Sequence, residues 1–439
     1  MCGILARYNA NGTGTSSDFD ALLIKLWNRG PDGFGTYHNL GISLGHRRLC
    51  VHPSTTKQPL EHKGWRLIVN GEFYSCSRDC LYLLDNLETL PLSLMHVDAV
   101  YAFVAWHPVH GIRVGRDRVG VCPLYVGATE DNLWFASELK ALKHCDWCSM
   151  FPPNTIYDGR DWMRIPSAPR GFRRVRNLLK GAVQRRLNMD VPWGVFLSGG
   201  LDSSIIASLA KQCIRPKGYP MLHTFSIGLH DSPDIGHARE VANYIGSVHH
   251  EVIFTIEEGL NCIPAVIRAI ETYDTTTVRA SVPMWLLARE VKRSGIKVML
   301  SGEGADELFA GYAYNKYAPN PEALQRESER KIHKLHAYDC LRANKCCAAW
   351  GVECRVPFLS DEMVHHSRTM DPFLKMWDTM EKEYLRTEFE QDLCNCGVLW
   401  RKKAQFSDAV GSRWIEACRA IPGGETNYYK SIFDSLYPD

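Results

Sequence analysis

The sequence predicts a multidomain α/β protein, and three features support this. A chain of 439 residues allows two or three domains at a typical size of about 150 residues each. The first half contains short apolar segments separated by turn-forming residues, as in a β-rich domain. From about residue 171, amphipathic helical stretches alternate with short apolar strands, which predicts a parallel sheet covered by helices on both faces.

In the β-rich half we expect strands over residues 67–69, 102–106, 124–126 and 134–136. Each run is short and apolar and lies between Gly, Asp, Asn or Pro residues, which end strands. A helix is expected over residues 22–27, after Ser17. Residues 151–171 are rich in turn formers, so a linker between two domains is expected in this region.

In the second half, strands and helices alternate as a doubly wound parallel domain requires. Helices are expected over residues 175–187 and 203–212, and a third begins at Thr255, where Glu258 completes a capping box. Buried strands are expected over residues 194–197, 222–227 and 297–300. The chain after about residue 322 is predicted to be mostly helical.

The composition is that of an ordinary soluble globular protein, with 45% apolar and 23% charged residues. The net charge of +2 provides no broad field for nucleic acid or a membrane surface, so neither is an expected partner. The N-terminus lacks a signal-peptide pattern, and no apolar run approaches the ~20 residues that span a bilayer. We therefore expect a cytoplasmic protein whose sixteen cysteines are reduced thiols.

The first chemical signal is Met1-Cys2-Gly3. Removal of Met1 would leave Cys2 with a free α-amine, whose reference pKa is about 8. This amine is the nearest base that could take the thiol proton and produce a thiolate that attacks an amide. Taken alone, an incidental cysteine after the initiator is the more common explanation.

Four further motifs follow Cys2 in order: Arg29-Gly30-Pro31-Asp32, His46-Arg47-Arg48-Leu49, Val69-Asn70-Gly71-Glu72 and Gly115-Arg116-Asp117-Arg118-Val119-Gly120. With them, roughly residues 2–150 resemble the class II glutamine amidotransferases, N-terminal-nucleophile (Ntn) hydrolases built as a four-layer αββα sandwich. The resemblance implies that Cys2 is the nucleophile and that Asn70 and Gly71 form the oxyanion hole. It also implies that glutamine is held by Arg48, Asn70, Gly71, Glu72 and Asp79.

The strongest motif is Leu197-Ser198-Gly199-Gly200-Leu201-Asp202-Ser203-Ser204, which follows a predicted strand and opens a helix. Its glycines let backbone N–H groups approach a phosphate, and the helix N-terminus adds positive potential. Asp202 suits such a site only if a cation is present, so we interpret it as a Mg²⁺ ligand. No Gly-Lys-Ser/Thr follows, and the motif resembles the pyrophosphate loop of ATP pyrophosphatases rather than a Walker loop.

A second acidic loop, Ser301-Gly302-Glu303-Gly304-Ala305-Asp306-Glu307, follows another predicted strand. Open α/β sheets bind ligands at the carboxyl ends of their strands, so Asp202 and Asp306 are expected to lie around Mg–pyrophosphate. By resemblance, Glu303 is the acid/base residue for ammonia. The nucleotide site would also include Leu197, Ser198, Gly199, Gly200, Ser203, Ser204, Ile227, Ser301 and Gly302.

Most of residues 172–439 resemble one family, the glutamine-hydrolysing asparagine synthetases. The resemblance lies in Glu271-Thr272-Tyr273-Asp274, Arg279-Ala280-Ser281, the stretch from Asp339 to Lys345, Trp350-Gly351-Val352-Glu353, Arg355-Val356-Pro357-Phe358-Leu359 and the stretch from Trp400 to Asp408. It implies a shortened member that uses glutamine, aspartate and ATP with Mg²⁺. Lys403 would neutralise charge on the α-phosphate, and a homodimer is expected.

The predicted organisation is a glutaminase domain over residues 1–155, a linker over 156–171 and a synthetase domain over 172–439. Two alternatives remain open at this point. One is an amidotransferase or cyclase that acts on another carboxylate in a natural-product pathway. The other is a non-catalytic member, suggested by the short segment between Glu72 and Asp79. The pair Cys145 and Cys148 has metal-ligand spacing, but no second pair completes a zinc site.

Overall fold

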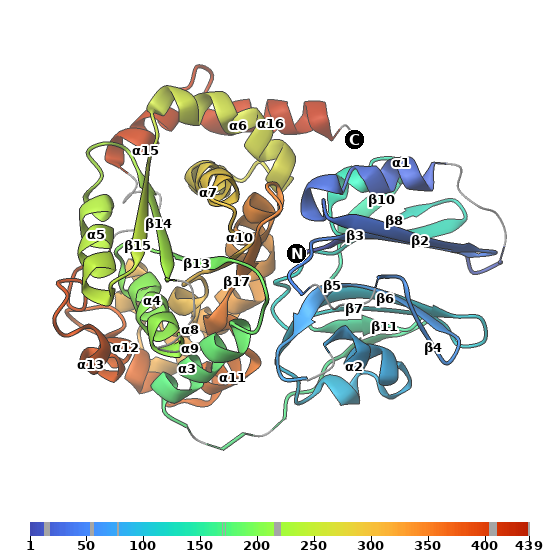
Figure 1. Cartoon of the computed structure of the whole chain (residues 1–439), viewed down its shortest axis with the longest axis horizontal. Coiled ribbons are helices and arrows are strands. Elements are labelled where there is room, and N and C mark those ends of the chain that lie inside the picture. The colour runs from blue at the N-terminus through green and yellow to red at the C-terminus, as the bar shows by residue number, and fades with distance from the viewer. Residues whose placement is uncertain are drawn as a thin grey trace. The chain divides into compact units, whose positions relative to one another are not determined.

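The structure is a computed structural model that describes residues 1–12, 18–52, 57–76, 79–168, 170–171, 173–214, 221–403 and 411–437. The chain divides into two compact units (Figure 1). Unit 1 comprises residues 1–169 with 348–351, and unit 2 comprises residues 170–347 with 352–439.

Unit 1 contains two six-stranded antiparallel sheets. The first has the order β10 (Trp147–Met150), β8 (Tyr125–Thr129), β9 (Asn132–Ala136), β1 (Gly3–Tyr8), β3 (Ile42–Arg48) and β2 (Gly33–Asn39). The second has the order β12 (Trp162–Arg164), β11 (Thr155–Tyr157), β7 (Gly111–Arg116), β6 (Ala99–His107), β5 (Trp65–Phe73) and β4 (Leu60–His62). Strands β1 and β3 of the first sheet contact β5 of the second, so the sheets pack face to face.

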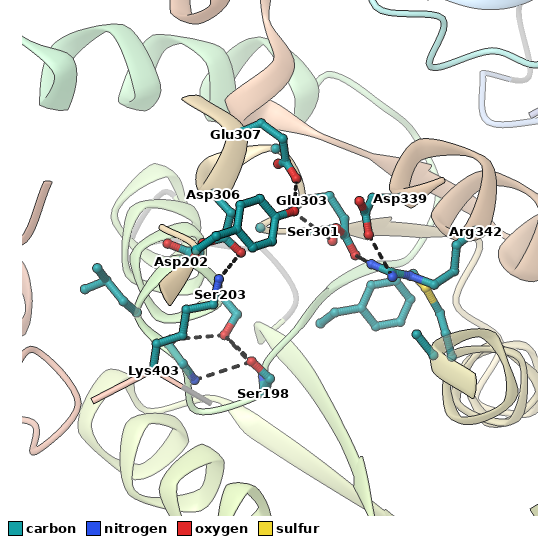
Figure 2. A pocket seen from close by; sticks show the side chains of 18 of the residues that line it. Ser198, Asp202, Ser203, Ser301, Glu303, Asp306, Glu307, Asp339, Arg342 and Lys403 are labelled. Atoms are coloured by element: carbon teal, nitrogen blue, oxygen red, sulfur yellow. Dashed lines mark hydrogen bonds and ion pairs between the residues drawn. The ribbon is translucent and has the colours of Figure 1, made fainter. Parts of the chain in front are cut away.

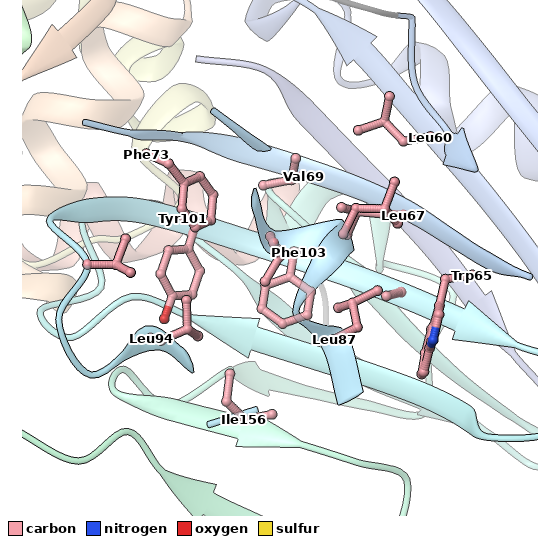
Figure 3. Close-up of a cluster of buried hydrophobic side chains, with 14 of the residues drawn as sticks. Leu60, Trp65, Leu67, Val69, Phe73, Leu87, Leu94, Tyr101, Phe103 and Ile156 are labelled. Atoms are coloured by element: carbon pink, nitrogen blue, oxygen red, sulfur yellow. The ribbon is translucent and has the colours of Figure 1, made fainter. Parts of the chain in front are cut away.

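A helix covers the outer face of each sheet. Helix α1 (Phe19–Ile24) packs Phe19, Leu22 and Leu23 against Leu5 and Trp134 of the first sheet. Helix α2 (Cys80–Asp85) and the turns after it cover the second sheet, with Leu87 beside Phe103 and Leu94 beside Tyr101 (Figure 3). Burial of such side chains supplies most of the stability of a sandwich. The predicted four-layer αββα arrangement is confirmed.

The segment predicted as a linker over residues 156–171 is partly strand. Strands β11 and β12 lie within or at the edge of it, and β11 pairs with β7 through Ile156 and Gly115. Ile156 is fully buried in the core of the second sheet (Figure 3). The prediction missed these strands because each has only three residues, too few for a pattern of alternating polarity.

Unit 2 contains a five-stranded parallel sheet with the order β15 (Val248–Ile253), β14 (His223–Gly228), β13 (Trp193–Phe196), β16 (Val298–Leu300) and β17 (Glu353–Arg355). The chain begins in the middle at β13, fills one edge with β14 and β15, and then returns to the other side with β16. The loops after β13 and β16 therefore diverge at a switch point, where open sheets bind ligands. The predicted doubly wound parallel domain is confirmed.

Helices flank this sheet and form the rest of unit 2 (Figure 1). The crossovers are α4 (Leu201–Cys213), α5 (Pro233–Ile245), α6 (Ile256–Ile270) and α7 (Thr275–Arg293), and α3 (Val175–Arg186) precedes the first strand. Thr255 caps α6 by accepting the N–H of Glu258 at 3.1 Å, as predicted, but the Glu258 carboxylate accepts from Arg289 at 2.7 Å instead of closing the predicted capping box. The C-terminal part is mainly helical and includes α9 (Pro321–Lys334), α10 (Asp339–Ala348), α12 (Glu383–Glu388), α15 (Ser412–Arg419) and α16 (Glu425–Leu436).

All sixteen cysteines lie in described residues and are free thiols. Only Cys148, in unit 1, and Cys394, in unit 2, are exposed. Among the described residues, no helix is both long and apolar enough to cross a bilayer.

Candidate active sites

Cys2 immediately precedes the central strand β1 of unit 1. Its Sγ lies 3.9 Å from the carbonyl oxygen of Leu49, and its own carbonyl accepts a hydrogen bond from Nε of Arg29 at 2.9 Å. Arg29 is fully buried and pairs with Oε1 of Glu138 at 3.0 Å. A buried charge pair therefore fixes the backbone of the predicted nucleophile.

Asn70 and Gly71 are adjacent residues of β5. Asn70 is fully buried, and within the described residues neither its Nδ2 nor its Oδ1 has a hydrogen-bond partner. A buried amide without partners costs about 1–3 kcal/mol, which a ligand can recover by bonding to it. At Gly71, a Cβ atom would lie 2.3 Å from the carbonyl oxygen of Val100, so the close approach of β6 requires glycine there.

The predicted glutamine-binding side chains lie at the ends of β3 and β5. Arg48 Nη2 donates to the carbonyl of His52 at 3.1 Å, and Nε2 of His52 lies 4.0 Å from Oε2 of Glu72. Asp79 accepts the N–H of Phe73 at 3.0 Å and has a φ of +46°, which is strained for a residue other than glycine. Residues 77–78, just before it, lie outside the described part of the chain.

Cys80, which the sequence analysis did not single out, lies close enough to these groups to be affected by their charge. Burial, followed by the charges of Asp79, Glu72 and Cys2, raises the pKa of the Cys80 thiol. A raised pKa keeps this thiol neutral near pH 7. Cys80 was recognisable only as the residue after Asp79, at the start of α2.

The second site is a cavity of about 580 Å³ in unit 2 (Figure 2). The loops after β13 and β16 meet there: a Cβ on Gly302 would lie 3.0 Å from the backbone nitrogen of Ser203. Eleven of the predicted residues line the cavity, namely Leu197, Ser198, Gly200, Asp202, Ser203, Ile227, Ser301, Gly302, Glu303, Asp306 and Lys403.

Two predicted nucleotide-site residues do not line the cavity. The hydroxyl of Ser204 donates to the carbonyl of Gly200 at 2.7 Å inside the first turn of α4, and Ser204 is fully buried. Gly199 has a φ of +71°, and a Cβ there would lie 2.6 Å from the nitrogen of Ala238. Both residues therefore stabilise the conformation of the loop on the side away from the cavity. A ligand in the cavity cannot reach the side chain of Ser204.

The two acidic loops face a pair of lysines. Lys382 Nζ donates to both carboxylate oxygens of Asp202, at 2.7 and 2.6 Å, and to Oδ1 of Asp306 at 2.7 Å. Lys403 forms an ion pair with Oδ2 of Asp306. Burial would raise the pKa of Asp306, but the ammonium groups of Lys382 and Lys403 hold it below its usual range. For Asp202, burial dominates and raises the pKa.

This arrangement fits a magnesium ion that arrives with phosphate. Both carboxylates point at one cation, and Mg²⁺ is commonly held by one or two carboxylates together with substrate phosphates. The described residues contain no cluster of three or more His, Cys, Asp or Glu side chains that could form an all-protein metal site. Asp202 and Asp306 would thus supply two of the ligands, and water or phosphate oxygens would supply the rest.

Glu303 lies beside Asp339 and Arg342, away from Lys403 (Figure 2). Arg342 Nη2 donates to its Oε1 at 2.7 Å, and Nη1 pairs with Asp339 at 2.8 Å. Burial, with the charges of Asp339 and Asp306, raises the pKa of Glu303 in spite of Arg342. A raised pKa makes a carboxylate better able to accept and hold a proton.

Sequence reasoning missed the residues that support these groups. Lys382 lies between Glu381 and Glu383, outside every motif on which the prediction rests, and was therefore not singled out. Tyr312 donates to Glu307, and its ring lies 5.0 Å below the Lys403 ammonium. Arg401 holds the phosphate loop by donating to the carbonyl of Gly199 at 3.1 Å and to Asp234 at 2.6 Å. Residues 404–408 of the motif from Trp400 to Asp408 lie outside the described residues.

Both halves of the chain match families of known proteins. An asparagine synthase family model matches residues 174–322 and 316–421. A glutamine amidotransferase domain model matches residues 1–90 and 88–191. A solved structure described as an allosteric regulatory enzyme of purine biosynthesis has a TM-score of 0.31 and 13% identity, covering 57% of this chain and 80% of its own, which is too low to support an argument.

Curated relatives match along the whole chain. Asparagine synthetase [glutamine-hydrolyzing] 3 of Arabidopsis thaliana is 38% identical, over all of this chain and 88% of its own length. The corresponding enzyme of Sandersonia aurantiaca is 38% identical over 100% of this chain and 97% of its own, and that of Triphysaria versicolor 39% over 100% and 86%. The chain belongs to the glutamine-hydrolysing asparagine synthetase family.

Proposed function

We propose that this protein makes asparagine from aspartate, with glutamine as nitrogen donor and ATP as the activating substrate. The products would be asparagine, glutamate, AMP and pyrophosphate. The observation that carries the proposal is the cavity of unit 2, where the phosphate-type loop after β13 and the acidic loop after β16 touch through Gly302 and Ser203. Identity of 38% along the whole chain supports the same reaction.

In the proposed first half-reaction, a β-carboxylate oxygen of aspartate attacks the α-phosphorus of ATP. The bond to the pyrophosphate oxygen breaks, and β-aspartyl-AMP forms. The ammonium of Lys403 would stabilise charge that grows on the α-phosphate, since a fixed cation needs no reorganisation. Asp202 and Asp306 would hold Mg²⁺, which neutralises the leaving pyrophosphate when bound.

In the proposed glutaminase reaction, the Cys2 thiolate attacks the side-chain amide of glutamine. Asn70 Nδ2 and the N–H of Gly71 would donate to the oxyanion, which fits the partnerless buried amide of Asn70. Ammonia leaves, and water hydrolyses the thioester to glutamate. Arg48, Glu72 and Asp79 would bind the α-carboxylate and α-amine of glutamine.

In the final step, ammonia attacks the acyl carbonyl of β-aspartyl-AMP and AMP departs. The attacking nitrogen must lose a proton, and Glu303 is the proposed acceptor. Its buried position and its bond to Arg342 fit this role, because the guanidinium holds the carboxylate in place.

We also propose that residues 1–155 hold the glutaminase site and residues 172–439 the synthetase site. A homodimer, a cytoplasmic location and no nucleic-acid or membrane partner complete the proposal, which the family resemblance and the small net charge of +2 support. Light scattering of the purified protein tests the dimer.

The test of the reaction compares wild type with Cys2→Ala, using aspartate and MgATP with either glutamine or ammonium chloride. We expect wild type to form asparagine, AMP and pyrophosphate with both donors. The variant should lose the glutamine reaction by at least about 10³-fold, because the nucleophile is gone, and keep the ammonia reaction. Pyrophosphate release with a different carboxylate, and none with aspartate, would instead identify another acceptor.

A further inference from the structure

Lys382 lies at the centre of the synthetase cavity, between the two proposed metal ligands. Its three N–H bonds are all satisfied by carboxylate oxygens, two from Asp202 and one from Asp306, at 2.6 to 2.7 Å. Its side chain is 2% exposed. The Lys382 ammonium therefore occupies the position in which a metal ion could contact the carboxylates of both Asp202 and Asp306.

The backbone around Lys382 is arranged for this contact. Lys382 has a φ of +57° and a ψ of +35°, a left-handed conformation that is unfavourable for lysine, directly before α12. The preceding residue, Glu381, is itself anchored, since it accepts hydrogen bonds from Arg386 and from the backbone N–H of Lys403. Strain of this kind persists only where the surroundings hold it in place.

Gly311 makes the contact sterically possible. A Cβ atom at Gly311 would lie 2.1 Å from Oδ1 of Asp306 and 2.9 Å from Cε of Lys382. Any side chain there would therefore push apart the carboxylate and the lysine arm. Lys403 is less central, because it contacts one oxygen of Asp306 and lies over the Tyr312 ring.

The charges at this centre balance without a metal ion. Asp202 and Asp306 carry two negative charges, and Lys382 and Lys403 carry two positive ones. A free divalent cation would have to displace a buried ammonium that already has three charge-assisted hydrogen bonds. A cation that arrives with a polyphosphate brings its own negative charge, and the phosphate oxygens give the displaced ammonium new partners.

We propose that Lys382 is a resident counter-cation that keeps divalent metal ions out of the nucleotide-free site. Metal then enters together with the nucleotide, and the lysine arm transfers from Asp202 and Asp306 to the phosphates. The inference rests on the proposed role of these two aspartates as metal ligands.

The test is direct binding of Mn²⁺, read from the electron paramagnetic resonance signal of the free ion. Without nucleotide, we expect wild type to bind Mn²⁺ with a dissociation constant in the millimolar range. Addition of β,γ-methylene-ATP should strengthen binding by at least tenfold. Lys382→Met should bind Mn²⁺ at least tenfold more tightly than wild type without nucleotide, because both carboxylates lose their partner.

Two further variants locate the effect. Asp202→Asn combined with Lys382→Met should lose the gained affinity, because one carboxylate is removed. Lys402→Met is the matched control, because Lys402 also lines the cavity and carries the same charge. Within the described residues, the carboxylates of Asp202 and Asp306 pair with Lys382 and Lys403 instead. The Mn²⁺ affinity of Lys402→Met should stay within twofold of wild type.

Tight, micromolar binding of Mn²⁺ by nucleotide-free wild type would overturn the inference, and this measurement needs no variant to fold. Unchanged affinity in a folded Lys382→Met protein, checked by circular dichroism, would overturn it too. If such a wild type still forms asparagine and AMP, the proposed function stands and only the inference fails. Wild type that forms no AMP with any carboxylate contradicts the proposed function itself.

Discussion

At the scale of single residues, the glutaminase site depends on a buried chain of charges that ends at Cys2. Glu138 is 4% exposed and lies between Arg29, at 3.0 Å, and Lys140, at 2.5 Å. Arg29 in turn donates to the carbonyl of Cys2. Since the thiol and the α-amine share the Cα of Cys2, the orientation of this carbonyl constrains both groups.

We therefore expect Glu138→Gln to act as a change in a positioning residue. The glutamine side chain can still accept a hydrogen bond from Arg29, but it lacks the negative charge of Glu138. A hydrogen bond to a charged group contributes about 1.5–3 kcal/mol. The kcat of the glutamine reaction should fall by about 10- to 100-fold, with a nearly unchanged KM for glutamine. The ammonia reaction should not change.

Lys140→Gln is the control for this prediction, because Lys140 is more exposed and touches Glu138 without reaching Arg29. It should leave both reactions within about twofold of wild type, as is usual for a partly exposed ion pair. Equal losses in the glutamine and ammonia reactions of Glu138→Gln would instead mean general destabilisation.

His46 gives unit 1 a specific sensitivity to acid. Burial, helped by the charge of Arg48, lowers its pKa from the usual 6.5 to about 3. Below pH 6.5, His46 is protonated in the unfolded chain, whereas in the folded protein it stays neutral down to about pH 3. The free energy of unfolding therefore falls as the pH falls. Each unit by which the pH falls in this window lowers the free energy of unfolding by about 1.4 kcal/mol.

Chemical denaturation at pH 7 and pH 5 tests this expectation with His46→Gln. Wild type should lose about 2 kcal/mol more free energy of unfolding between the two values than the variant, which cannot titrate. A parallel loss in both proteins would show that His46 is protonated normally in the folded state.

At the scale of elements, the C-terminal helix α16 supports the wall of the synthetase cavity. Glu425 at its start pairs with Arg279 of α7, with both side chains at most 15% exposed, and Thr426 bonds to Thr275 at 3.0 Å. Thr276 and Thr277, in the same turn of α7, line the cavity. Helix α16 therefore fixes the start of α7.

Glu425→Ala should leave Arg279 as a buried charge without its main partner. Loss of one member of a buried pair costs about 3–5 kcal/mol, so the melting temperature should fall by several degrees. We also expect a higher KM for aspartate or ATP, because the cavity wall is loosened. Lys430→Ala, which breaks the exposed pair with Asp434 on the same helix, should change neither quantity.

Elements were predictable from the sequence where they are long or marked by a motif. The strands that lead into Ser198 and Ser301, and the helix capped by Thr255, have clear apolar patterns and turn signals. Strands β11, β12 and β17 have three residues each and owe their conformation to pairing with a neighbour, which no local pattern records. The position of Lys382 could not be predicted for a similar reason. Only tertiary contacts place it between the loops that carry Asp202 and Asp306.

At the scale of the whole molecule, strand–helix alternation predicted the parallel sheet of the second half, and the family resemblance predicted the antiparallel sandwich of the first. Cys2 and Asn70 belong to the antiparallel sandwich, whereas Asp202 and Asp306 follow strands of the parallel sheet. The aligned region with the Arabidopsis relative spans 507 positions, more than the 439 residues of this chain, so the relative has internal segments that this chain lacks. The short path from Glu72 to the strained Asp79 is consistent with one such deletion.

The exposure of the cysteines has a practical consequence for spectroscopy. Cys148 and Cys394 are the two exposed thiols, and one lies in each unit, while the other fourteen are wholly or partly covered. Maleimide dyes should therefore react first at these two positions in Cys2→Ala, which lacks the nucleophilic thiol proposed for the glutaminase reaction. With a donor fluorophore at one position and an acceptor at the other, a change in energy transfer on addition of glutamine or MgATP would show that the separation of the two units changes.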